Sequence, residues 1–163
     1  TYWTEWFAIG LVQAGLLTAF YSLSASLLRV SGGYLADRIG GEKVTLISFV
    51  IVAAGALLMI LSGRSMGSAV TGVILLALGM GFANAAVFKL VPKYSPAAVG
   101  GAAGIVGGLG AFGGFVIPPL MGMFVKFNGS AGYAQGFSVF LVMSLAAVGC
   151  IVLLMRHSPA TVR

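Results

Sequence analysis

Long apolar runs alternate with short polar segments along the whole chain. The runs lie at about 6–36, 44–62, 66–91, 97–125 and 134–155. Each is long enough to cross the ~30 Å hydrocarbon core of a bilayer as an α-helix, which rises ~1.5 Å per residue. The strict two-residue alternation that marks the strands of a membrane barrel is missing. The pattern therefore predicts an all-α membrane protein with five transmembrane helices.

Short polar segments separate the predicted helices. Residues 39–42 predict a tight turn, and residues 63–65 predict a shorter one. Pro92 is expected to close the third helix, and Ser95 and Pro96 are expected to open the fourth as N-cap and first helical residue. Connections this short predict that neighbouring helices are antiparallel.

Composition narrows the class of protein. Of the 163 residues, 60% are hydrophobic and 7% are charged, whereas soluble domains have about 25% charged residues. A soluble enzyme is therefore excluded. The single cysteine, Cys150, lies in an apolar run and has no internal partner for a disulfide. Because the chain starts at Thr1 without a leader, we expect it to be a fragment of a longer protein.

Basic residues are distributed unequally between the two ends of the predicted helices. One end has Arg38, Lys43, Lys89, Lys93, Arg156 and Arg163. The other end has Arg64 and Lys126. The positive-inside rule then predicts a multi-pass protein of the cell inner (plasma) membrane, with the N-terminus outside and the C-terminus cytoplasmic. Because topology explains most of the net charge of +6, we expect no nucleic-acid partner.

Arg29 is the basic residue that topology does not explain. It precedes Asp37 by eight residues, which places it roughly 12 Å inside its helix. An intramembrane arginine is costly, at ~2.5–3.5 kcal/mol on insertion scales, and normally has a partner. The acids Glu5, Asp37 and Glu42 all lie at span ends. A planar oxyanion would fit the guanidinium in a bidentate manner. The alternative is snorkelling to the interface, or pairing with a carboxylate elsewhere in the protein.

The fourth predicted helix is rich in glycine. The chain has 25 glycines, and this helix contains Gly100, Gly101, Gly104, Gly107, Gly108, Gly110, Gly113, Gly114 and Gly122. It also contains Pro118 and Pro119, which free backbone groups and bend a helix. Glycines three or four residues apart allow close helix packing. Bare backbone also suits a narrow path in which peptide N–H groups contact a small ion, and the two interpretations are compatible.

A few further polar residues accompany the helices. Asn84, near the middle of the third helix, either donates to a ligand or bridges helices, and we favour bridging. Lys89 is expected to snorkel to the headgroups, and His157 to be interfacial. The sequence has no Asp, Glu or His at membrane depth to carry protons, and no nucleophile–base pair, metal-ligand cluster or phosphate loop. We therefore expect no enzyme activity, metal site or cofactor.

One motif resembles a family signature. It reads Gly33-Tyr-Leu-Ala-Asp37-Arg38-Ile-Gly40-Gly41-Glu-Lys43. This resembles the cytosolic loop motif of the major facilitator superfamily, with Gly41 where Arg is more common. In that family the motif is thought to hold one conformational state. The resemblance implies this role for Gly33, Asp37, Arg38, Gly40 and Lys43.

A second set of motifs is more specific. The run from Asn84 to Pro92, the run from Gly104 to Pro119, and Arg29-Val-Ser-Gly-Gly look like the C-terminal half of a nitrate/nitrite porter. The resemblance implies that residues 1–163 form a partial C-terminal transmembrane bundle, helices eight to twelve of a twelve-helix fold. It implies that Arg29 is a substrate arginine. The candidate substrate-binding residues are Arg29, Asn84, Gly104, Gly107, Gly108, Gly110, Gly113 and Gly114.

The function implied by this resemblance is transmembrane transport of nitrate and nitrite by alternating access. The implied partners are the nitrate or nitrite anion, the lipid bilayer and a missing N-terminal half. Five helices cannot hold a substrate between two six-helix halves, so the chain would be one part of the transporter. Two alternatives stay open: a major facilitator transporter of small organic anions such as formate or oxalate, and a non-transporting membrane scaffold fragment.

Overall fold

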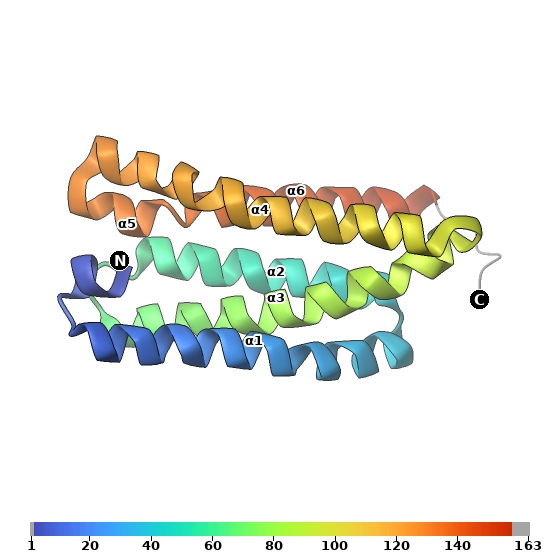
Figure 1. Ribbon diagram of the computed structural model, residues 1–163, viewed down its shortest axis with the longest axis horizontal. Helices are drawn as coiled ribbons and strands as arrows, with labels where there is room; N and C mark the ends of the chain where they lie inside the picture. Colours follow the sequence, from blue (N-terminus) through green and yellow to red (C-terminus); the bar gives the residue numbers. More distant parts are fainter. Residues whose placement is uncertain (1, 158–163) are drawn as a thin grey trace.

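The computed structural model describes residues 2–157, which are almost entirely helical (Figure 1). The long helices are α1 (Leu11–Ile39), α2 (Gly41–Leu61), α3 (Met66–Tyr94), α4 (Val99–Asn128) and α6 (Ser138–His157). Shorter segments are η1 (Tyr2–Trp6), η2 (Pro96–Ala98), η3 (Gly129–Ala131) and α5 (Gly132–Gln135). Five helical spans are long and apolar enough to cross a membrane, and the described residues contain no strand. The predicted all-α class is confirmed.

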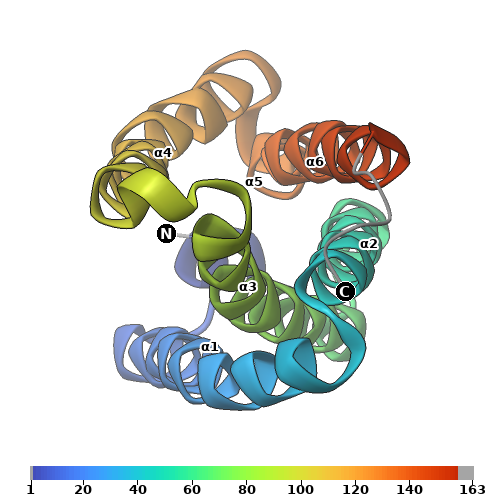
Figure 2. The same cartoon turned by 90° about the vertical axis from the view of Figure 1, so that its right-hand side faces the viewer.

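The long helices form a bundle in which α3 lies between α1 and α2 (Figures 1 and 2). Successive helices run in opposite directions, so α1 and α3 are parallel. Helix α6 lies along α2, and α5 links α6 to α4. We call α1, α2 and α3 the three-helix group. We call the end with the α1–α2 turn the turn end of the bundle, and the opposite end the η1 end.

The turn between α1 and α2 is tighter than the predicted turn at 39–42. Only Gly40 separates the two helices, and Gly41 and Glu42 already belong to α2. The φ angle of Gly40 is 96°, a value that glycine adopts without strain. The Gly40 N–H donates to the Ala36 carbonyl at 3.1 Å and thereby closes the last turn of α1. One glycine is thus enough to reverse the chain.

The predicted end of the third helix at Pro92 is wrong. Helix α3 continues through Pro92 to Tyr94. Proline removes one backbone donor, and the following turn still closes, because the Ser95 N–H donates to the Val91 carbonyl at 2.9 Å. The predicted start of the fourth helix also differs. Pro96 opens the short segment η2, Ser95 makes no side-chain capping bond, and α4 begins at Val99.

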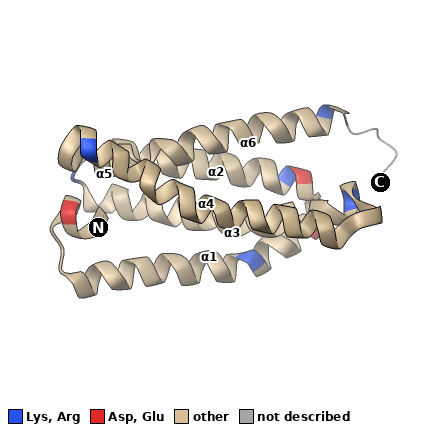
Figure 3. Ribbon diagram, turned by 45° about the horizontal axis from the view of Figure 1, so that its top comes forward, with Lys and Arg blue, Asp and Glu red and all other residues tan. Residues whose placement is uncertain are grey.

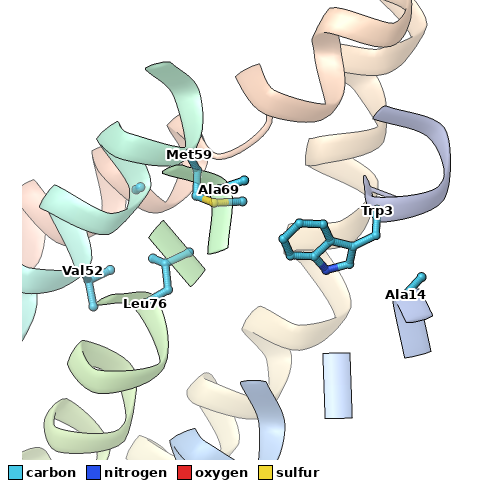
Figure 4. Packing of buried hydrophobic residues seen from close by; sticks show 7 residues of the cluster. Trp3, Ala14, Val52, Met59, Ala69 and Leu76 are labelled. Atoms are coloured by element: carbon cyan, nitrogen blue, oxygen red, sulfur yellow. The ribbon is translucent and has the colours of Figure 1, made fainter. Parts of the chain in front are cut away.

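The main core lies toward the η1 end, where the three-helix group packs with η1 and with Phe140 and Leu141 of α6. Trp3 packs with the cluster that includes Val52, Met59 and Leu76 (Figure 4). Met59 is fully buried, and Trp3 is 7% exposed. The Trp6 Nε1–H also donates to the Gly63 carbonyl at 2.6 Å. These contacts fasten η1 to the turn between α2 and α3.

Glycines bring the backbones of the three-helix group close together. A Cβ atom at Gly81 would lie 2.7 Å from the carbonyl oxygen of Ala25, and one at Gly79 would lie 2.8 Å from that of Ser48. These distances leave no room for a side chain. Helix pairs α1–α3 and α2–α3 therefore pack through backbone contact, as expected for helices in a membrane.

Helix α4 is packed very differently from α3. None of the 30 residues of α4 is buried. Large apolar side chains such as Leu109, Phe112 and Phe115 are more than 60% exposed. The helix continues without interruption through Pro118 and Pro119. Within the part of the chain that the structure describes, α4 is thus a largely uncovered apolar helix.

Candidate functional site

Arg29 lies inside α1, ten residues before the helix ends at Ile39. At ~1.5 Å per residue this is about 15 Å along the helix axis. The side chain is exposed, and no hydrogen-bond or ion-pair partner for its guanidinium exists among residues 2–157. The positive charge is available to a group outside them.

Contacts between α1 and α3 fix the level of Arg29 relative to α3. Gly33 lies beside Ala85, with 4.0 Å between the Ala85 Cβ and a Cβ built on Gly33. Asp37 pairs with Lys89, which is 52 residues later in the chain. Gly33 and Ala85 are also 52 residues apart in the chain. In this parallel register Arg29 is level with Gly81.

Asn84 lies on the stretch of α3 that packs against α1, and its side chain is half-buried. In the same register it is level with Gly32, three residues further along the axis than Arg29, or about 4.5 Å. Among residues 2–157 no hydrogen bond joins the Asn84 amide to another helix. The bridging interpretation of Asn84 thus has no partner in this part of the chain.

The glycine-rich stretch of α4 is open. A Cβ atom at Gly104, Gly108, Gly110 or Gly114 would meet nothing within 4 Å. At Gly107 it would lie 3.7 Å from the Phe88 ring, and at Gly113 it would meet only Ile117 of the same helix. Close helix packing, one of the two interpretations of this stretch, is therefore not seen in residues 2–157. Arg29 and Asn84 belong to the α1–α3 pair, whereas these glycines belong to the uncovered helix α4.

A cavity of about 150 Å³ lies between α1 and α3, away from the predicted residues. Its walls are apolar and include Phe20, Leu28 and Val73. None of the candidate substrate-binding residues lines it. The cavity belongs to the α1–α3 contact rather than to the predicted site.

The residues of the loop motif lie together at the turn end of the bundle. Gly33, Asp37 and Arg38 belong to the last two turns of α1, and Lys43 lies in the first turn of α2. The Arg38 guanidinium carbon lies 4.7 Å from the centre of the Tyr34 ring, within the range of a cation–π contact. Lys43 is exposed.

Two ion pairs join this motif to α3. Lys89 pairs with Asp37, a partner that the sequence analysis did not predict, and its snorkelling to the headgroups stays a prediction. Lys93 pairs with Glu42 at 2.6 Å, and the Tyr94 hydroxyl donates to the same carboxylate at 2.9 Å. Sequence reasoning missed both pairs. The available signal was that two of only three acids lie at this end, together with two lysines four residues apart on one helix face.

Charges elsewhere lie at the helix ends. Figure 3 shows most basic and acidic segments near the two ends of the bundle. Arg64 lies at the η1 end, where its guanidinium carbon is 5.5 Å from the centre of the Trp6 ring. Arg163, which contributes to the predicted orientation, lies outside the described residues. Within the described part of the chain, no group of three or more His, Cys, Asp or Glu residues could hold a metal ion.

The five long apolar helices define an integral membrane protein. The family model of the Major Facilitator Superfamily matches residues 1–163. The chain belongs to this superfamily, and it is a multi-pass membrane protein.

Several curated proteins are similar to the chain. The probable nitrate/nitrite antiporter NarK1 of Thermus thermophilus is 36% identical over 165 residues, covering 90% of this chain and 36% of that protein. The probable nitrate transporter NarT of Staphylococcus aureus strain JH9 is 34% identical over 157 residues, covering 96% of this chain and 38% of that protein. The chain thus spans little more than a third of the length of these relatives. No solved structure is significantly similar to it.

Proposed function

We propose that this chain is part of a transporter that moves nitrate and nitrite across the membrane. The observation that carries the proposal is the intramembrane Arg29, which has no acidic partner among residues 2–157. The names of the similar proteins from Thermus thermophilus and Staphylococcus aureus support the choice of anion. Because those relatives are described as transporters, we propose a transport role without enzyme activity.

In the proposed site, Arg29 neutralises the anion. Nitrate is planar, and the planar guanidinium donates two parallel N–H bonds to such an oxyanion, which a lysine ammonium does not reproduce. Asn84, about one turn away along the axis, is a candidate second donor. The bare backbone from Gly104 to Gly114 lines the path, since its glycines have no side chain to narrow it.

The proposal requires a partner for these five helices. Transporters of this architecture hold substrate near the bilayer midplane between two halves and rock one half against the other. We propose that an N-terminal half covers the exposed faces of α1 and α4 and supplies the rest of the site. The orientation proposed is N-terminus outside and C-terminus cytoplasmic, in the inner membrane. It is tested by labelling Ser65→Cys with an impermeant maleimide in a Cys150→Ala background, which should succeed only from outside.

The test of the proposed function is nitrate uptake by the complete transporter in vesicles. Arg29→Lys keeps the charge and removes the bidentate fork, so uptake should fall by about tenfold or more. The matched control is Arg64→Lys, the same substitution at the η1 end, which should leave uptake unchanged. Full uptake in Arg29→Lys would contradict the proposed role of the guanidinium.

Competition experiments distinguish a nitrate transporter from a transporter of organic anions. An excess of nitrite should inhibit nitrate uptake, whereas formate and oxalate should not. Inhibition by formate or oxalate would favour the organic-anion transporter. Absence of flux both from this chain alone in liposomes and from the chain combined with an N-terminal half would favour a membrane scaffold.

A further inference from the structure

Helix α1 has two different exposed sides. Between residues 12 and 34 its exposed large apolar side chains recur every three or four residues, as at Leu16, Phe20, Leu23 and Leu27. Because a helix turns by about 100° per residue, these side chains form one apolar ridge. Arg29, Ser26 and Ser22 are exposed too, but they lie about 100° around the helix from the middle of the ridge. The ridge suits lipid or another helix, whereas the side with Arg29 suits a polar path.

The hydroxyls of Ser22 and Ser26 are not used inside the helix. The neighbouring Thr18 hydroxyl donates to the Ala14 carbonyl at 2.9 Å, one turn earlier in α1. Ser22 and Ser26 make neither this kind of hydrogen bond nor another one within residues 2–157. A hydroxyl without a partner at membrane depth costs free energy. Both donors are therefore available to an acceptor outside the described residues.

The direction of side chains in a helix brings the Arg29 guanidinium over these two hydroxyls. In an α-helix the Cα–Cβ bond tilts toward the N-terminus, and a long side chain lies over the residues three and four positions earlier. For Arg29 these are Ser26 and Ala25, and Ser22 lies one turn further along the same side. An anion at the outer edge of the guanidinium thus lies beside Ser22 and Ser26.

The spacing of the two serines fits a single oxygen atom between them. Residues four apart on a helix have Cβ atoms about 5–6 Å apart, and a hydroxyl donates over about 2.7–2.8 Å. One oxygen can therefore accept from Ser22 and Ser26 together. Nitrate has three oxygens in one plane, so a guanidinium that binds two of them leaves the third pointing away. Nitrite has no third oxygen.

We propose that Ser22 and Ser26 are specificity-determining residues: their hydroxyls donate to the third oxygen of a nitrate bound to Arg29 and so favour nitrate over nitrite. The inference rests on the proposed function and deepens it. Arg29 supplies the charge that both anions use, and the two hydroxyls contact the oxygen that only nitrate has. Such a site disfavours the smaller anion, because nitrite leaves the two donors unpaired.

The test is nitrate uptake by the complete transporter in vesicles, with nitrite as the competitor. The double variant Ser22→Ala/Ser26→Ala should raise the KM for nitrate about tenfold, as expected for lost hydrogen bonds to a charged group. It should not raise the inhibition constant of nitrite. The matched control is Ser24→Ala/Ser31→Ala, which removes two hydroxyls on the opposite side of α1 that are also without a hydrogen bond in residues 2–157. The control should change neither constant.

Three results would overturn the inference: an unchanged KM for nitrate in Ser22→Ala/Ser26→Ala, an equal rise in the inhibition constant of nitrite, or the same rise in KM in the control. Failure of the proposed function gives a different result, because Arg29→Lys then leaves nitrate uptake intact. A defective Arg29→Lys together with an unchanged KM in Ser22→Ala/Ser26→Ala overturns the inference alone.

Discussion

The glycines of α3 and those of α4 have opposite surroundings. At Gly79 and Gly81 an added Cβ would lie within 3 Å of another helix, whereas at Gly104, Gly108 and Gly114 it would meet nothing within 4 Å. Both sets lie in long apolar helices. Glycine thus has two uses in this chain. In the three-helix group it allows backbone contact, and in α4 it leaves an open helix surface.

This difference separates stability from the proposed transport role. The packed glycines cannot change without moving a neighbouring backbone, so their substitution should act on folding. The open glycines of α4 can accept a side chain without a clash in the described residues. Their substitution should act only where something outside these residues, a second half or an anion, approaches the helix.

The largest effect on stability is expected at Gly79. Gly79→Ala places a Cβ 2.6 Å from the Val52 side chain and 2.8 Å from the Ser48 carbonyl oxygen. Overpacking of this kind should lower the free energy of unfolding by about 1–3 kcal/mol. Thermal unfolding in detergent measures it, with Gly108→Ala as the control that should unfold like the wild type. Equal losses in the two variants would remove the distinction between the two sets of glycines.

A variant at an open glycine of α4 tests the proposed transport role. Gly108→Leu adds a large side chain to the open surface of α4, so nitrate uptake should fall about tenfold if this surface lines the path. Its unfolding temperature should not change, since a Cβ atom at Gly108 meets nothing within 4 Å. The control is Gly149→Leu, an equally open glycine on α6, which should leave uptake intact. Loss of uptake in both variants would mean that the effect is not specific to α4.

The sequence predicts the fold better than it predicts the surroundings of single residues. Apolar runs of span length are enough to predict the five helices, because a bilayer requires each spanning segment to satisfy its own backbone hydrogen bonds. The residues at which a helix begins and ends are harder to predict from sequence. Whether Pro92 ends α3, for example, depends on whether the next helical turn can still form its backbone hydrogen bond. The spacing of glycines also does not show which of them are packed and which are open. That depends on contact with another helix, whose residues are distant in the sequence.

For the candidate site too, the sequence identifies a key residue but not the partners of its charged residues. Arg29 is identifiable from sequence, since a charge inside a long apolar run is expensive wherever it points. The partner of Lys89 is not, because Asp37 lies 52 residues earlier and reaches Lys89 only through the parallel α1–α3 packing. The ligand of Arg29 remains a proposal for a related reason: within residues 2–157 its guanidinium has no hydrogen-bond or ion-pair partner.

A smaller loss of stability is expected at the turn end of the three-helix group. Glu42 is 13% exposed and Lys93 is 34% exposed, so water screens their 2.6 Å ion pair only in part. Glu42→Gln should lower the free energy of unfolding by about 1 kcal/mol. Lys126→Met, which removes an exposed lysine of α4, is the matched control and should have no effect. Chemical denaturation measures the free energy of unfolding of both variants. An equally large loss in Lys126→Met and in Glu42→Gln would contradict the contrast between α4 and the three-helix group.

The smallest loss of stability is expected at the η1 end, where Trp6 donates a hydrogen bond to the turn between α2 and α3. Trp6→Phe keeps an aromatic ring near Arg64 but removes the 2.6 Å hydrogen bond from Nε1 to the Gly63 carbonyl. One such bond contributes about 0.5–1.5 kcal/mol, and the partly exposed site places the expected loss at the lower end of this range. Hydrogen exchange should also accelerate in the turn at residues 62–65. Phe127→Leu at the end of α4, where the ring is 75% exposed, should change neither measurement. If exchange in the turn stays slow in Trp6→Phe, the core cluster around Trp3 holds η1 without this bond, and the packed region is then stabilised by apolar contact alone at this end.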